Sequence, residues 1–163
     1  MTSSSEDIFS LNGEIFKRVP VRDMRSGFQG KSLEDALQTL LEKYPEILPG
    51  SQIDPSSEEP PRFAMLRREM PVAGWSLDHL YVDQFGVLTL VETKLLQNPD
   101  SRRDVIGQIV EYAANAQEAW GNGLVRQYAA EFWNKKGQDL EDVLHDRFPG
   151  IDQEELWQTI ESN

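Results

Sequence analysis

The stretch Leu88–Lys94, LTLVETK, is an apolar run that ends with two charged residues, Glu92 and Lys94. Asp78 lies 14 residues before Glu92, at the start of another apolar run. The residues that join the two runs, Asp83–Val87, place glycine last in a three-residue loop, where a left-handed backbone is needed. This loop predicts an antiparallel hairpin in which counting back along both strands brings Asp78 opposite Glu92.

The predicted pairing would bring two carboxylates face to face. A two-residue loop would instead place Asp78 opposite Val91 and send Glu92 to the other face, but the glycine position favours the first register. Opposed like charges destabilise a strand pair by about 0.2–1 kcal/mol. A bound cation, a shared proton or the nearby Lys94 could offset this cost. Because Mg²⁺ typically accepts one or two carboxylates and keeps several waters, Asp78 and Glu92 are candidate metal ligands.

Two predicted helices carry further candidates. Glu34 lies in the first turn of one helix, at the border of its apolar stripe, and an acid in this place is, taken alone, more often favoured by the helix dipole than used as a ligand. In the second helix, Gln108 and Tyr112 are one turn apart. Arg102 and Arg103 lie in its first turn, where backbone amides also attract anions, so they are either phosphate contacts or solvated charges.

These residues together resemble the PD-(D/E)XK nuclease superfamily. The shared features are a glutamate on an opening helix, then an aspartate, a hairpin, Glu-x-Lys at a strand end, and a helix with glutamine four residues before tyrosine. More narrowly, SLEDALQTLLEKYPEILPG, GWSLDHLYVDQFGVLTLVETK and RRDVIGQIVEYAANA resemble a group of uncharacterised bacterial proteins placed in that superfamily. The resemblance covers roughly residues 32–120.

The resemblance implies a role for each residue. The two opposed carboxylates would bind Mg²⁺ or Mn²⁺, with the Thr93 carbonyl as an extra ligand. Lys94 would orient the attacking water or stabilise the developing charge, Glu34 would hold a water or a second metal, and Gln108 would support the site. Tyr112 would lie beside the nucleic acid. Carboxylates, a metal and one lysine are sufficient for phosphodiester hydrolysis.

The chain departs from the superfamily pattern in two places. Ser76-Leu77 precedes the aspartate where proline is frequent. After Trp120 no alternating apolar pattern predicts the further strand of the shared core, and residues 124–163 read as helices. We therefore expect the chain to be an N-terminal piece of a longer protein.

Composition limits the function classes. The chain has 163 residues, no cysteine and a formal net charge of −12, of which residues 134–163 contribute eight Asp/Glu against three Lys/Arg. Cysteine catalysis and thiolate metal sites are excluded. A protein that coats nucleic acid is normally basic, whereas an enzyme needs only a local basic groove. The N-terminus lacks a signal-peptide pattern and no run is long enough for a membrane span, so we expect a cytoplasmic protein.

The expected fold class is α/β (α+β), with a restriction-endonuclease-like core of a helix, a three-stranded antiparallel meander and a helix. Residues 8–22 predict a hairpin joined by Asn12-Gly13. Ser32 and Asp35 form a capping box that opens the first core helix. The expected strands are 62–70, 76–83 and 87–94. The expected regions are 1–30 (hairpin and loop), 31–120 (core) and 121–163 (acidic helical extension).

The second core helix is expected to follow Asn98-Pro99 and to run for about 20 residues to near Trp120. Its predicted buried stripe consists of Val105, Ile106, Ile109, Val110, Ala113 and Trp120. His79 alternates to the face opposite Asp78, and we assign it no catalytic part.

The expected function is metal-dependent hydrolysis of DNA, with Mg²⁺ or Mn²⁺ as cofactor, nucleic acid as partner, no membrane association and a homodimer as a possible assembly. One alternative is a catalytically inactive nuclease-fold module that binds nucleic acid or a protein. A glycosidase-like carboxylate pair is another. The charged residues could also form a structural ion-pair cluster with Arg67 or Arg68.

Overall fold

The computed structural model describes residues 8–12, 15–19, 28, 30–94 and 101–162. The fold is mixed α+β. One antiparallel sheet has the order β3-β4-β5, with bounds β3 (Phe63–Val72), β4 (Trp75–Asp83) and β5 (Leu88–Val91). A separate two-stranded sheet pairs β1 (Ile8–Asn12) with β2 (Ile15–Val19). The N-terminal hairpin is therefore confirmed, but Asn12 pairs with Ile15 and so belongs to strand β1 rather than to the connecting turn.

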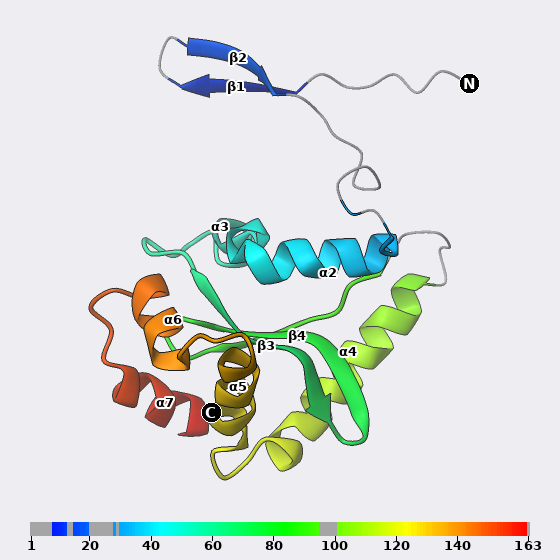
Figure 1. Ribbon diagram of the computed structural model, residues 1–163, viewed down its shortest axis with the longest axis vertical. Coiled ribbons are helices and arrows are strands. Elements are labelled where there is room, and N and C mark those ends of the chain that lie inside the picture. Colours follow the sequence, from blue (N-terminus) through cyan, green and yellow to red (C-terminus); the bar gives the residue numbers. More distant parts are fainter. Residues whose placement is uncertain (1–7, 13–14, 20–27, 29, 95–100, 163) are drawn as a thin grey trace.

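Six α-helices lie within the described residues (Figure 1): α2 (Leu33–Lys43), α3 (Gly50–Ile53), α4 (Ser101–Ala119), α5 (Leu124–Lys135), α6 (Leu140–Arg147) and α7 (Gln153–Ser162). A short 3₁₀ helix, η1 (Pro45–Ile47), follows α2. The described residues after Trp120 form helices and no strand, as predicted. Asn98-Pro99, the predicted cap of α4, lies outside the described residues. None of the described helices is both long enough and apolar enough to span a bilayer.

The predicted β4–β5 register is confirmed. His79 pairs with Val91 and Val82 with Leu88. Around the loop, the Asp83 amide donates to the Val87 carbonyl at 3.1 Å, and Gly86 has φ 77°, the left-handed conformation expected of the last loop residue. The strand itself ends at Val91 rather than Lys94, so the residues after it no longer follow the strand pleat.

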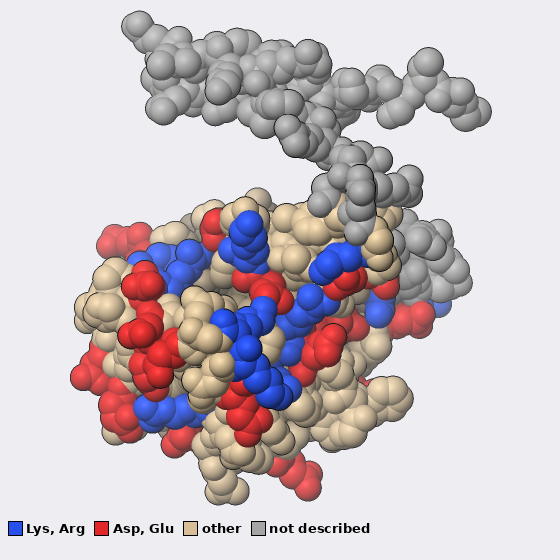
Figure 2. All heavy atoms as spheres, in the orientation of Figure 1, with Lys and Arg blue, Asp and Glu red and all other residues tan. Residues whose placement is uncertain are grey.

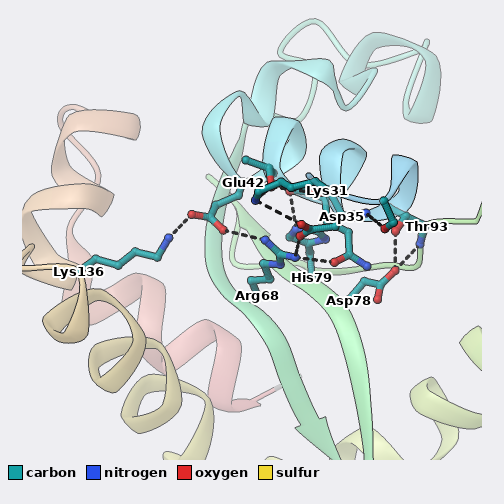
Figure 3. A network of polar contacts seen from close by, with 11 residues as sticks. Lys31, Asp35, Glu42, Arg68, Asp78, His79, Thr93 and Lys136 are labelled. Atoms are coloured by element: carbon teal, nitrogen blue, oxygen red, sulfur yellow. Dashed lines mark hydrogen bonds and ion pairs between the residues drawn. The ribbon is translucent and has the colours of Figure 1, made fainter. Parts of the chain in front are cut away.

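Helix α2 covers one face of the sheet. Its N-cap is Ser32, whose hydroxyl accepts a hydrogen bond from the Asp35 amide, as the capping box predicts. From β3, the Arg68 guanidinium donates to Asp35 at 2.5 Å and to Gln38 at 2.8 Å. From β4, His79 Nε2 lies 3.0 Å from the Gln38 carbonyl (Figure 3). Polar contacts therefore fix α2 above the strands.

Helices α4 and α5 cover the other face (Figure 1). The Trp120 indole donates to the Pro71 carbonyl at 2.6 Å, and the Trp133 indole donates to the Met65 carbonyl at 3.1 Å. Arg67, next to Arg68 on β3, points to this side and donates to the Tyr128 carbonyl on α5 at 3.0 Å. Because neighbouring strand residues point to opposite faces, these contacts place α2 and α5 on opposite sides of β3.

The predicted buried stripe of α4 is wrong in part. Trp120 is buried, but Ile106 and Val110 are 65% and 62% exposed and Ala113 is exposed. Tyr112 is buried instead, at 5% exposure. The helix is rotated so that the side carrying Tyr112, Ile109 and Trp120 packs against the core, and the side carrying Ile106 and Val110 faces outward.

The C-terminal helices belong to the same core as the sheet. Their buried residues are Val125, Ala129, Trp133, Leu140, Leu144, Phe148, Leu156, Trp157 and Ile160. Arg147 Nε donates to the Phe63 carbonyl at 2.6 Å, which covers one end of the edge strand β3. The described part of this region, residues 121–162, thus shares the core of the sheet, although its composition suggested an acidic extension.

The β4–β5 loop generates a first prediction. Gly86 and Gly74 both have left-handed φ values, 77° and 84°, so alanine at either costs about 1–2 kcal/mol of unfolding free energy. A Cβ at Gly86 would also lie 2.8 Å from Thr159 Cγ2, whereas none of the described atoms lies within 4 Å at Gly74. We expect Gly86→Ala to lower the free energy of urea unfolding more than Gly74→Ala. Equal losses would contradict close packing of α7 on this loop.

His79 generates a second prediction. It is fully buried, its Nε2 faces a carbonyl and must donate, and Nδ1 has no partner among the described atoms. Burial lowers the pKa of His79 below its ordinary value of 6.5. As the pH falls, the His79 imidazole therefore takes up a proton in the unfolded chain before it does so in the folded chain. The stability that is present above pH 6.5 is consequently lost as the pH falls below 6.5.

The expected loss approaches about 1.4 kcal/mol per pH unit for this one proton. The measurement is urea unfolding between pH 7.5 and pH 5 for the native chain and for His79→Gln, whose amide can still donate to Gln38. The native chain should lose more stability than His79→Gln over this range. Parallel pH profiles would show that His79 does not titrate on unfolding.

Candidate active site

Asp78 and Thr93 form the best-defined contact of the site. The Thr93 amide and the Thr93 hydroxyl both donate to Oδ2 of Asp78, at 2.7 and 2.6 Å (Figure 3). Thr93 is buried, at 5% exposure. Both bonds reach the same oxygen, so Thr93 fixes the carboxylate without engaging Oδ1. The sequence does not predict this role of the Thr93 side chain, because the strand pleat would place Thr93 and Asp78 on opposite faces of the sheet.

Glu92 follows Val91, the last paired residue of β5, and its carboxyl group interacts with Asp78. Its side chain is only 4% exposed, and Lys94 Nζ lies 3.4 Å from Glu92 Oε1. Burial raises the pKa of Glu92 above its ordinary value, and the charge of Asp78 raises it further, against the opposing effect of Lys94. The repulsion predicted from the sequence is therefore present, and Lys94 offsets part of it.

Lys94 is the cation of the site. Burial lowers its pKa, but Glu92 first, and then Asp78 and Glu34, outweigh that effect, so the pKa of Lys94 is raised. Glu34, from the first turn of α2, is close enough to contribute its charge to Lys94. The lysine therefore remains an ammonium group at neutral pH, paired with Glu92 and influenced by the charges of Asp78 and Glu34.

Helix α4 supplies the wall of the site. The Tyr112 hydroxyl donates to the Ser76 carbonyl at 3.3 Å. Burial raises the pKa of Tyr112, and the charges of Glu92 and Asp78 add to this. Gln108 lies one turn away on the same side of α4. The structure thus brings Gln108 and Tyr112 to the inner wall, where Tyr112 is buried rather than on the surface.

The arginines have other positions. Arg103 is exposed in the first turn of α4, and the side chain of Arg102 lies outside the described structure. Arg67 and Arg68 bind α5 and α2 respectively. The alternative ion-pair cluster with Arg67 or Arg68 is therefore not formed, and Lys94 is the cation found beside Glu92 within the described residues.

Two buried oxygen atoms bear on whether the residues of the site suit a metal ion. Glu92 Oε2 and Gln108 Oε1 are both buried without a hydrogen-bond partner among the described residues. An unpaired buried acceptor costs about 1–3 kcal/mol, which a hard cation or a metal-bound water would recover. No group of three or more His, Cys, Asp and Glu residues that could hold a metal is found in the described ranges. The donors fit a cation that keeps several waters, such as Mg²⁺, with Asp78 and Glu92 as its carboxylates.

Strand β3 is irregular where it passes Asp78. Its register shifts between Met65 and Arg67, and Glu69 has φ 54°. A left-handed conformation is uncommon for glutamate, and such outliers cluster at functional sites. Counting along the β3–β4 register places Glu69 opposite Asp78, between the pairs formed by Arg68 and Met70. The sequence carries no turn signal that predicts this irregularity.

Comparisons with protein-family models, with curated protein sequences and with solved structures find no match for this chain. The geometry of the site, the order of its residues and their chemistry are therefore the basis for assigning a function.

The Glu92–Lys94 pair generates a prediction that needs no substrate. Lys94 lowers the pKa of Glu92 by its charge and its hydrogen bond, so Lys94→Met should raise that pKa further. The measurement is a carbon-13 NMR titration of the Glu92 carboxyl. Lys136→Met is the matched control, because Lys136 pairs with Glu42 on α2 instead. An unchanged Glu92 pKa in Lys94→Met would contradict the contact.

Proposed function

We propose that the chain has a PD-(D/E)XK nuclease-like core and hydrolyses phosphodiester bonds of DNA with Mg²⁺ or Mn²⁺. The observation that supports this most is the juxtaposition of Asp78 with the buried Glu92, whose Oε2 has no partner within the described structure. A carboxylate pair of this kind is costly as a purely structural feature.

Each residue has a role in the proposed reaction. Asp78 and Glu92 would hold the metal, with the Thr93 carbonyl as a third oxygen, and Thr93 would keep Asp78 oriented through its two hydrogen bonds to Oδ2. When bound, the metal would polarise the phosphate and lower the pKa of a coordinated water. The Lys94 ammonium would orient the attacking water and balance the charge that develops on the phosphate oxygens.

The surrounding surface suits an enzyme better than a protein that coats nucleic acid nonspecifically. Figure 2 shows Lys and Arg interspersed with Asp and Glu across the face in view. Several of the basic side chains are paired: Lys31 with Asp35, Arg68 with Asp35 and Glu42, and Lys136 with Glu42. Paired cations contribute little to phosphate binding, and Lys94 is itself paired with Glu92. The proposed affinity for DNA therefore rests mainly on the metal and on Arg103 at the start of α4, while Glu34 and Gln108 would support the metal and its waters.

Metal binding and cleavage test the proposal. We expect Mn²⁺ to bind the native chain in a calorimetric titration, and to bind more tightly as the pH rises through the raised pKa of Glu92, because the carboxyl group must be deprotonated to bind a metal. Glu92→Gln should abolish this binding. Lys94→Ala should retain the metal but lower cleavage of single-stranded, duplex or branched DNA by about 100-fold or more.

Glu111→Gln is the matched control, since Glu111 is an exposed glutamate on α4 away from the site. It should leave binding and cleavage unchanged. If the native chain binds neither metal, the proposal fails. Metal binding without cleavage of any substrate would instead support the catalytically inactive binding module.

A further inference from the structure

Arg68 joins strand β3 to helix α2 over two helical turns. One of its terminal nitrogens donates to Asp35 Oδ1 at 2.5 Å and to Gln38 Oε1 at 2.8 Å, and the other lies 3.7 Å from Glu42 Oε2. These three partners are three and four positions apart, so they lie on one side of α2. The planar fork of an arginine holds its acceptors in fixed directions. Arg68 therefore restricts both the position and the rotation of the helix.

The apolar packing of α2 is limited in comparison. Of its eleven residues, Ala36 and Leu41 are buried, and the other leucines of the helix are half-buried. The Arg68 side chain is itself only 18% exposed, and hydrogen bonds between charged groups are stronger than those between neutral groups. His79 on β4 adds a second polar anchor, because its Nε2 donates to the Gln38 carbonyl. The position of α2 on the sheet therefore depends on these polar anchors as well as on apolar area.

The contacts of Arg68 reach the turn of α2 that carries Glu34. Asp35, the acceptor of the shorter hydrogen bond, directly follows Glu34 in the first turn. In Figure 3, Asp35 lies toward the end of α2 that is next to Thr93 and Asp78. The charge of Glu34 acts on Lys94, the cation of the candidate site. A shift of α2 would therefore move Glu34 relative to the site.

We propose that Arg68 is a positioning residue of the candidate active site and that it holds Glu34 in place through α2. The proposal rests on the proposed nuclease function for the role of Glu34, which would hold a water or a second metal. A misplacement of about 1 Å that originates far from the reacting atoms can lower a reaction rate by about 100-fold. Arg68 would therefore affect the rate through the position of the helix.

A distance measurement tests the position of α2 without metal or DNA. Because the chain has no cysteine, Lys43→Cys on α2 and Glu111→Cys on α4, both at exposed positions, provide two spin labels for pulsed electron paramagnetic resonance. We expect Arg68→Met to shift or broaden the distance between the labels. Arg68→Lys, which keeps the charge but not the fork, should shift it less. An unchanged distance in a folded Arg68→Met variant overturns the proposal.

Arg67→Met is the matched control, because Arg67 is the neighbouring arginine of β3 and donates to α5 instead. It should leave the distance between the labels unchanged. Gln38→Ala is a milder variant, which removes one acceptor of Arg68 and keeps the backbone carbonyl that His79 binds. It should shift the distance in the same direction by a smaller amount. This variant decides the question if circular dichroism shows that Arg68→Met is unfolded.

Single-turnover cleavage rates at saturating Mn²⁺ test whether Arg68 acts through Glu34. We expect Arg68→Met and Glu34→Gln each to lower the rate by about tenfold or more, and the double variant to be no slower than Glu34→Gln alone. Independent losses that multiply in the double variant overturn the route through Glu34. A native chain that cleaves no substrate refutes the proposed function, whereas the distance between the labels still decides whether Arg68 positions α2.

Discussion

The candidate site depends on the hydrogen bonds around one buried aspartate in the β4–β5 loop. The backbone of Asp83 bonds with Gly86 and Val87, and its Oδ1 accepts from the amides of Phe85 and Val87, each at 2.9 Å. These bonds set a three-residue loop, and the loop sets the strand register. A one-residue slip would send Glu92 to the other face and separate it from Asp78.

The carboxylates that this register brings together are stabilised unequally. Asp78 receives two hydrogen bonds from Thr93, whereas Glu92 has Lys94 on one oxygen and no partner on the other among the described residues. The unpaired oxygen and the raised pKa of Glu92 follow from the same arrangement, because a buried carboxylate beside another is stable only when a proton or a cation joins it. A purely structural cluster would be expected to satisfy both acids with neighbouring donors.

Sequence patterns correctly predicted those helices and turns that depend on interactions between residues close together in the chain. The position of Gly86 predicted the register, Ser32 with Asp35 predicted the start of α2, and the absence of alternation after Trp120 predicted a helical C-terminus. The rules failed where distant segments decide the outcome. The role of Arg68 depends on α2, and the packing of the acidic C-terminal helices depends on apolar residues such as Trp157 meeting the sheet. The Thr93–Asp78 contact depends on where β5 ends, which periodicity cannot locate to one residue.

The rotation of α4 is the most informative of these failures. Apolar periodicity alone turns Ile106 and Val110 toward the sheet, but the structure turns Gln108 and Tyr112 inward beside the carboxylates. Exposing two large aliphatic side chains opposes this rotation, and Tyr112 compensates by burying its ring and bonding to Ser76. A helix that must present one face to a polar site and still cover its apolar face needs a second contact surface. The inward packing of Tyr112 therefore accounts for the uncovered side of α4.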